Sequence, residues 1–235
     1  MLSKKTLITT TTIIILALAV GGVYSYKKNL IPFGKKPVAE VLTPEKLLAA
    51  FVIKNSNLTA QEAQLFQQRF DETKKTLQSS PDDFSSWLYL GVLKKGVSDY
   101  EGARDVFAYA GRLRPQSSTP FANLADLYTY FLNDPVKAEI SIKQAIANGP
   151  NDYNFYISLA DLYRYKFSDG AVKYEQTMLD AIAKFPDNAN LIASLAGFYR
   201  ETNQTQKAIE WYEKLVKLSP ENQMAKEDLV ELRKK

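Results

Sequence analysis

Apolar residues between positions 84 and 115 recur three and four residues apart, which places their side chains on one face of an α-helix. Two such stripes follow each other in this stretch, and Pro115 closes it. The stripes consist of Trp87, Leu90 and Gly91, and then Ala103, Phe107 and Ala110. The pattern predicts two amphipathic helices that face each other.

The same double stripe returns three more times along the chain. Its closing prolines are spaced by 34, 35, 36 and 34 residues: Pro81, Pro115, Pro150, Pro186 and Pro220. A fixed period of this length indicates stacked supersecondary units, because one unit cannot bury both of its stripes alone. We therefore expect four helix pairs, at residues 84–117, 118–152, 153–188 and 189–222.

These recurring positions resemble the tetratricopeptide repeat, in which a W-x2-L-G-x2-Y segment precedes an A-x3-F segment and a closing proline. The resemblance covers residues 84–222 and rests on seven positions that recur four times. Lys94 departs from it where the first tyrosine is expected, and Tyr174 where a small residue is expected. The resemblance implies an all-α, right-handed α-solenoid of helix-turn-helix repeats.

Acidic and amide side chains follow four of the prolines at the same place in the turn. They are Asp83, Asp152, Asn188 and Asn222. Such side chains accept hydrogen bonds from the free amides at a helix start, which is worth about 1 kcal/mol each. Because they recur once per unit, we interpret them as helix caps and not as metal ligands or catalytic acids.

Residues 1–26 predict a transmembrane helix. The segment from Leu7 to Tyr24 carries no charge over 18 residues, and lysine pairs flank it on both sides. About 20 residues of helix span roughly 30 Å, the thickness of the hydrocarbon layer. A cleaved signal peptide is the alternative, with Ala17-Leu18-Ala19 as the small-residue site.

The orientation of this anchor follows from the basic tail in front of it, which favours an extracytoplasmic location for the rest of the chain. Lys27, Lys28, Lys35 and Lys36 come after the span, so the positive-inside rule leaves a cytoplasmic-facing domain as the alternative.

A linker over residues 27–42 and further helices are expected to flank the repeats. Thr43 and Pro44 predict a helix start, with an apolar face formed by Leu47, Leu48, Phe51 and Val52. Thr59 and Glu62 predict a capping box for a second helix that runs to about Ser79. We expect residues 43–80 to cap the stack at its N-terminal end and residues 223–235 to form a C-terminal capping helix.

Composition narrows the possible chemistry. The chain has no histidine and no cysteine, which removes histidine bases, cysteine nucleophiles and the usual zinc ligands. Six of its 30 basic residues lie in residues 1–36, which contain no acid, so the other 24 face all 26 acidic residues. We find no basic stripe of the kind that nucleic-acid binding needs. We therefore expect no cofactor, no metal and no nucleic acid.

The resemblance also implies a binding surface, because the first helix of each tetratricopeptide pair lines a concave groove that holds a peptide or a partner's helix. Mapped onto this chain, the groove positions are Leu88, Val92, Lys95, Ala122, Asp126, Thr129, Tyr130, Asn154, Ile157, Asp161, Arg164, Tyr165, Asn190, Ala193, Gly197 and Arg200. Some tetratricopeptide cochaperones clamp a C-terminal carboxylate here, but this chain has Leu88 and Val92 at two clamp positions, and Asn123 alone retains part of the set.

The resulting hypothesis is a membrane-tethered, non-catalytic scaffold or adaptor that binds a protein or peptide partner in this groove. An enzyme would need a carboxylate pair such as Asp126 with Asp161, which we interpret as matched surface charges of adjacent units. A structural subunit of a cell-envelope or membrane assembly, using the convex face or the N-terminal helices, is the alternative.

Overall fold

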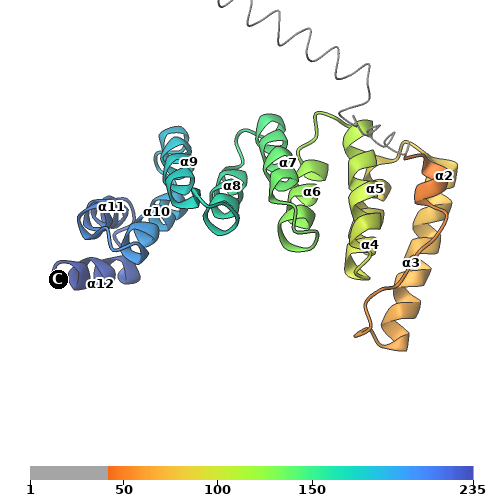
Figure 1. Ribbon diagram of the computed structural model, residues 1–235, viewed down its shortest axis with the longest axis horizontal. Coiled ribbons are helices and arrows are strands. Elements are labelled where there is room, and N and C mark those ends of the chain that lie inside the picture. The colour runs from red at the N-terminus through yellow and green to blue at the C-terminus, as the bar shows by residue number, and fades with distance from the viewer. Residues whose placement is uncertain (1–41, 235) are drawn as a thin grey trace, which may run out of the picture. The chain divides into compact units, whose positions relative to one another are not determined.

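Helices account for all regular secondary structure in residues 42–234, the part of the chain that the computed structural model describes (Figure 1). They are α2 (Pro44–Leu47), α3 (Ala60–Ser79), α4 (Phe84–Gly96), α5 (Tyr100–Leu113), α6 (Thr119–Tyr130), α7 (Pro135–Asn148), α8 (Tyr153–Lys166), α9 (Gly170–Lys184), α10 (Ala189–Glu201), α11 (Thr205–Leu218) and α12 (Gln223–Leu232). The predicted anchor and nearly all of the predicted linker lie outside the described residues. No helix within residues 42–234 has the length and apolar character needed to cross a membrane.

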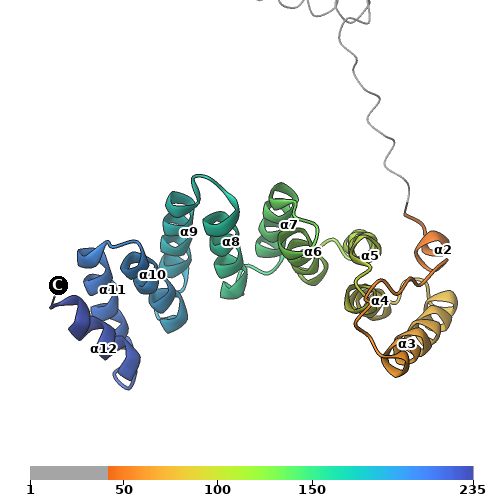
Figure 2. The same cartoon turned by 60° about the horizontal axis from the view of Figure 1, so that its bottom comes forward.

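The helices pack in chain order as successive pairs. α4 packs with α5, α6 with α7, α8 with α9 and α10 with α11, and each pair packs on the next (Figure 2). α3 packs on α4 at one end of this series, and α12 packs on α11 at the other. The architecture is an all-α helical-repeat solenoid, in which each unit buries its apolar stripes against its neighbours.

The apolar core is correspondingly divided into four clusters instead of one central core. One cluster joins α2, α3, α4 and α5 around Trp87, and the next joins α4, α5 and α6 around Phe107. A third joins α6, α7 and α8 around Ile142, and the fourth runs from α8 to α12 around Leu195. Small residues permit this close packing: a Cβ atom added to Gly91 would lie 2.4 Å from the ring of Phe107.

The predicted caps are confirmed. Asp83, Asp152, Asn188 and Asn222 each accept a hydrogen bond from a backbone N–H in the first turn of α4, α8, α10 and α12, respectively. The capping box of Thr59 and Glu62 at the start of α3 is confirmed as well. These local signals mark the starts of α3, α4, α8, α10 and α12, whereas α6 begins without a side-chain cap.

The turns between the two helices of a pair are of two kinds, one with a residue of positive φ and one with a closely packed glycine. Ser98, Asn133 and Asn203 adopt positive φ angles of 62°, 47° and 57° between the two helices of their pairs. Between α8 and α9, Gly170 starts the second helix so close to α8 that a Cβ atom would lie 2.1 Å from the carbonyl oxygen of Tyr163. Only glycine fits this approach.

Tyr174 fits a position where a small residue was expected because its side chain reaches into the next pair. It is buried, its hydroxyl donates to the carbonyl oxygen of Ser194 at 3.2 Å, and its ring lies 4.4 Å from that of Phe198. The third pair thus closes through a contact with α10.

The helix predicted at Thr43 is much shorter than its apolar pattern indicates. Thr43 accepts a hydrogen bond from the backbone of Lys46, but α2 ends at Leu47, so Phe51 and Val52 lie beyond it. The following segment is not helical, and the backbone N–H groups of residues 54 and 55 donate to the carbonyl oxygen of Val97 at 2.9 and 3.0 Å.

Lys94 gives the physical reason for this difference. Its ammonium group is buried and donates to the carbonyl oxygen of Ala50 at 3.1 Å and to the carboxylate of Asp99 at 3.2 Å. Carbonyls inside a helix are already bonded within the helix, whereas a non-helical backbone offers free acceptors. The lysine that replaces the expected tyrosine is therefore satisfied by a non-helical segment.

Candidate functional site

The sixteen predicted groove residues lie on α4, α6, α8 and α10, the first helices of the four pairs. Three of them expose large apolar or aromatic side chains: Val92, Tyr130 and Tyr165 are 50%, 70% and 68% exposed. Exposed tyrosines of this kind are common anchors of protein interfaces, because a rigid ring offers much contact area and a polar tip.

A hollow of about 190 Å³ lies between α6 and α8. Five of the predicted groove residues line it: Ala122, Asp126, Thr129, Tyr130 and Asn154. Sites for drug-sized ligands occupy about 300 to 1,000 Å³, so the hollow suits one inserted side chain better than a small molecule.

Other predicted groove residues serve the packing of the solenoid. Leu88 packs against two core clusters, and Ile157 and Ala193 pack against the C-terminal cluster. Thr129 is buried, and its hydroxyl donates to the carbonyl oxygen of Ala125 at 2.8 Å. Gly197 differs from these, because a Cβ atom there would meet no atom within 4 Å.

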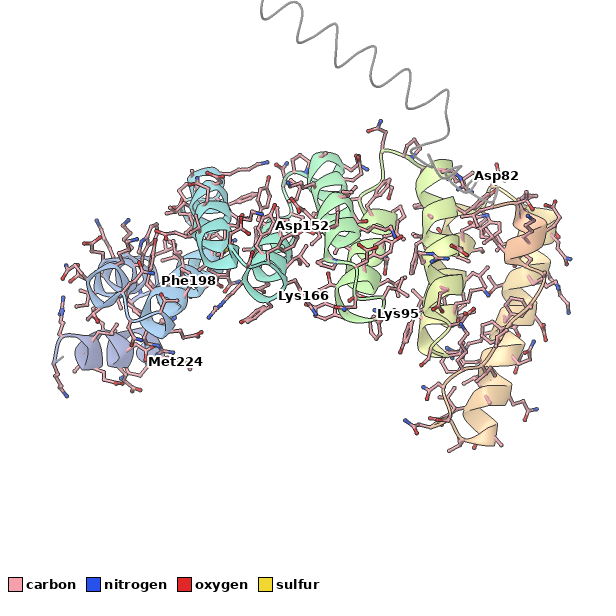
Figure 3. All side chains as sticks on the ribbon, viewed as in Figure 1. Asp82, Lys95, Asp152, Lys166, Phe198 and Met224 are labelled. Atoms are coloured by element: carbon pink, nitrogen blue, oxygen red, sulfur yellow. The ribbon has the colours of Figure 1, made fainter. Side chains whose placement is uncertain are left out.

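Ion pairs connect the first helices of neighbouring pairs. Lys95 at the end of α4, labelled in Figure 3, pairs with Asp126 of α6. Arg164 of α8 pairs with Glu201 at the end of α10. Arg200 of α10 pairs with Asp228 of α12. These pairs are partly exposed, so each contributes about 0.2 to 1 kcal/mol.

Arg164 also holds aromatic residues together. Its guanidinium carbon lies 5.2 Å from the ring centroid of Phe198, 5.4 Å from that of Tyr174 and 5.3 Å from that of Tyr165. The first two rings belong to the core between α9 and α10. Arg164 is therefore a residue that joins two repeat units, besides its place on the predicted groove face.

Asp161 is different from the other carboxylates. It is partly buried, and within residues 42–234 it forms no hydrogen bond and no ion pair. Burial raises the pKa of its carboxyl above the ordinary value, and the charge of Arg164 one turn away opposes this shift. Burial and the charge of Asp161 together raise the pKa of the Tyr174 hydroxyl to about 12.

No cluster of three or more His, Cys, Asp or Glu side chains that could hold a metal ion occurs in the described part of the chain. Asp126 and Asp161, the carboxylate pair that an enzyme would need, also differ in environment. Asp126 lines the hollow and is paired with Lys95, whereas Asp161 does not line it.

Comparison with known proteins identifies the repeat. The family described as tetratricopeptide repeat matches residues 189–222, while no curated protein matches the sequence. Among solved structures, a MamA protein superimposes with a TM-score of 0.54 at 16% identity, covering 76% of this chain and 94% of its own. YrrB, described as a TPR protein with an unusual peptide-binding site, gives 0.50 at 11% identity, covering 68% and 81%. Yeast Tom70 gives 0.53 at 17% identity, covering 73% of this chain and 36% of its own.

The last helix pair, α10 with α11, matches the tetratricopeptide repeat (TPR) family, and the other three pairs share the helix-pair fold of the solved TPR structures. We refer to each of the four pairs as a TPR. TPR proteins generally act as scaffolds for protein interactions and are typically non-catalytic. At these identities the solved structures establish the fold, and what they bind belongs to those proteins.

The TPR frame explains why Asp161 lacks a partner. Lys95, Thr129, Arg164 and Arg200 occupy the same position, eleven residues after the first residue of each TPR. Lys95 and Arg164 form ion pairs with the first helix of the next TPR, and Arg200 forms one with α12. The second TPR has a threonine there, and its hydroxyl bonds within its own helix instead.

The sequence prediction missed part of the hollow. Phe155 and Ser158 of α8 and Ile142 and Ala145 of α7 also line it. Ser158 could have been found, because it continues the helical stripe formed by Asn154 and Asp161. The residues of α7 could not, because the resemblance to the tetratricopeptide repeat places the groove on the first helices alone.

Proposed function

We propose that the protein is a membrane-tethered TPR scaffold that binds a protein or peptide partner on the face formed by α4, α6, α8 and α10. The observation that carries this proposal is the hollow between α6 and α8, whose rim includes the exposed ring of Tyr130. A second exposed ring, that of Tyr165, belongs to the neighbouring helix α8. An apolar recess beside exposed aromatic rings is the usual composition of an interface centre.

The tether is part of the proposal and rests on the uncharged stretch of residues 7–24. We further propose that the TPRs lie on the extracytoplasmic side, on the basis of the basic N-terminal tail. Protease treatment of intact cells and of spheroplasts tests this location, since digestion only after lysis would rule out export.

The groove is tested by comparing partners that crosslink to the full-length, membrane-inserted protein and to its variants. The double variant Tyr130→Ala with Tyr165→Ala removes two rings that are largely exposed. We expect it to lose the partner by about tenfold or more, since aromatic anchors dominate interface energy. Arg164 is left intact, because its replacement would also disturb the junction between α8 and α10.

A matched variant on a different helix serves as the control. Val136 and Ile140 lie one turn apart on α7 and are 59% and 63% exposed. Replacing both by alanine should leave crosslinking to the partner unchanged if the groove is the binding face. Unchanged crosslinking in the double tyrosine variant would contradict the proposal.

These exposed side chains favour one alternative function. Val136 and Ile140 of α7, together with Val172 of α9 at 73% exposure, form apolar surface on the second helices of the TPRs. A structural subunit of a membrane or cell-envelope assembly would use such a surface. Loss of the partner in the α7 variant, with retention in the tyrosine variant, would favour this alternative.

A further inference from the structure

Asp161 is the starting point, because its environment is unique among the acidic side chains of residues 42–234. Every other buried or partly buried carboxylate there accepts a hydrogen bond or joins an ion pair. The acidic side chains that share its lack of a partner are exposed to solvent: Asp82, Asp187, Glu210 and Glu221. A carboxylate that is partly removed from water and left without a partner raises the free energy of the protein, so a specific reason for its presence is required.

The neighbouring junction shows what such a carboxylate needs. Asp126 occupies in α6 the position that Asp161 occupies in α8, eight residues after the start of the TPR. The ammonium group of Lys95 from the preceding first helix pairs with Asp126. The residue equivalent to Lys95 before Asp161 is Thr129, whose buried hydroxyl bonds to its own helix. The junction between α6 and α8 therefore has the aspartate of the preceding junction without the lysine that pairs with it.

Arg164 does not replace the missing cation. It lies on the same helix as Asp161, one turn further on, and its guanidinium group forms an ion pair with Glu201 of α10. Asp126 and Glu201 are each paired with one cation, so Asp161 is the uncompensated charge of this group.

We propose that Asp161 receives an arginine or lysine side chain from the bound partner, while an apolar side chain of the same segment enters the hollow between α6 and α8. This inference rests on the proposed function and names the chemistry of the partner. A guanidinium group or an ammonium group forms charge-assisted hydrogen bonds with a carboxylate, which are stronger than neutral ones. The missing ion pair of the second junction is thus completed between two molecules.

The spacing of the two features limits the sequence of the segment. Ser158 lines the hollow, and Asp161 lies three residues further along α8, about 4.5 Å along the helix axis. Side chains about 5 to 7 Å apart are two residues apart in an extended peptide or one turn apart in a helix. We therefore expect an apolar residue separated from the arginine or lysine by one residue in an extended segment, or by two or three in a helical one.

The test selects random peptides displayed on phage against the full-length protein in detergent. The expected result is enrichment of peptides that combine arginine or lysine with an apolar residue at this spacing. The affinity of a synthetic copy of the most enriched peptide is then measured by fluorescence anisotropy against the wild-type protein and its variants.

Two variants remove the proposed charge recognition by different means. Asp161→Asn removes the anion, and Thr129→Lys supplies the missing cation from within the chain. Each should weaken binding of the peptide by about tenfold or more, because a partly desolvated charge pair is lost. Thr129→Lys should at the same time stabilise the fold, so a folding defect cannot account for its loss of binding. Because Thr129 also lines the hollow, Thr129→Met, with a long uncharged side chain, controls for filling of the hollow and should weaken binding less than Thr129→Lys. Asp187→Asn is the matched control, since Asp187 is an exposed carboxylate of the turn before α10, and it should leave the affinity unchanged.

The outcomes separate this inference from the proposed function. Selected peptides that lack basic residues and bind Asp161→Asn normally, but not the double tyrosine variant, would overturn the inference and leave the groove function intact. Peptides that bind the double tyrosine variant normally would contradict both. A synthetic peptide of residues 27–41, which contains four lysines, is tested as a competitor. Tighter binding of this peptide than of the selected ones, lost in Asp161→Asn, would assign the site to the chain itself and overturn the assignment to a partner.

Discussion

Two neighbouring junctions of the solenoid are compared, α4 with α6 and α6 with α8. Their buried apolar residues, the apolar layer, are alike, whereas the charged and polar residues beside that layer, the polar edge, differ. Leu127 and Leu162 are each the tenth residue of their TPR and are 0% and 2% exposed. At the first junction Lys95 neutralises Asp126. At the second, the hydroxyl of Thr129 donates to the carbonyl oxygen of Ala125 in its own helix, and Asp161 has no hydrogen bond or ion pair within residues 42–234.

The difference shows which positions of a repeat are constrained. Each unit must bury its stripes against the next, so the apolar layer recurs with little variation. The polar edge contributes little to stability when it is solvated, which leaves it free to differ from one junction to the next. A departure from the repeat at the polar edge is therefore a better indicator of binding than a departure in the core.

The largest expected effect tests whether the apolar layers are equivalent. Leu127→Ala and Leu162→Ala each create a cavity among buried side chains, and each should lower the free energy of unfolding by about 2 to 5 kcal/mol. Denaturant unfolding followed by circular dichroism measures both. A loss at Leu162 far below that at Leu127 would show that the junctions differ in their cores and would end the comparison.

The second prediction concerns the ion pair of the first junction. Lys95→Met keeps the aliphatic stem and removes the charge, so it should lower the free energy of unfolding by about 0.5 to 1 kcal/mol. Because the pair is partly exposed, the difference from wild type should shrink at high salt. A destabilisation that persists unchanged at high salt would assign the effect to packing against Phe131, whose ring centroid lies 5.1 Å from the lysine nitrogen.

The parts of the structure that follow from local sequence could be predicted, and the rest depended on contacts between units. The caps at Asp83 and Asp152 need only the residues that directly follow them, which is why they were predicted correctly. The length of α2 could not be predicted, because it depends on Lys94, which bonds to a carbonyl 44 residues earlier in the chain.

The sequence predicts which helix faces form the groove, but it does not predict which charged side chains of the groove are paired. Periodicity placed Asp126 and Asp161 in the same position of adjacent TPRs. It could not show which of them is paired, because the cations of the equivalent position reach different places in the next helix. Lys95 reaches the middle of α6, whereas Arg164 reaches the last residue of α10.

The third prediction concerns a variant that gives the junction of α6 with α8 the same ion pair as the junction of α4 with α6. Thr129→Lys places a cation opposite Asp161 at a position where the other three TPRs already carry lysine or arginine. The new ion pair should raise the free energy of unfolding by about 0.5 kcal/mol. Thermal unfolding of this variant alone and combined with Asp161→Asn measures the coupling between the two sites. An equal change from Thr129→Lys in both backgrounds would show that the lysine does not meet Asp161.

The smallest expected effect is on the free energy of unfolding, which should change in opposite directions when Asp161 and Glu175 are each replaced by the corresponding amide. Burial raises the pKa of Asp161 in the folded state, so its ionised form is disfavoured there and its penalty is complete at pH values above that raised pKa. Asp161→Asn should therefore stabilise the protein at neutral pH, by at most about 0.5 kcal/mol for this partly exposed group. The gain should disappear as the pH falls toward about 4, the ordinary pKa of an aspartate.

Glu175→Gln provides the opposite case. Hydrogen bonds from Lys207 and Tyr199 lower the pKa of Glu175, so its ionised form is favoured in the folded state and stabilises the protein above the ordinary pKa of a glutamate. This variant should destabilise at neutral pH, and its difference from wild type should also vanish in acid. Unfolding curves should therefore approach the wild type from above for Asp161→Asn by a pH of about 4, whereas for Glu175→Gln they should approach it from below only at lower pH, as the pH falls through the lowered pKa of Glu175. The same sign for both would mean that Asp161 has a stabilising partner within the chain, and the second junction would then be as complete as the first.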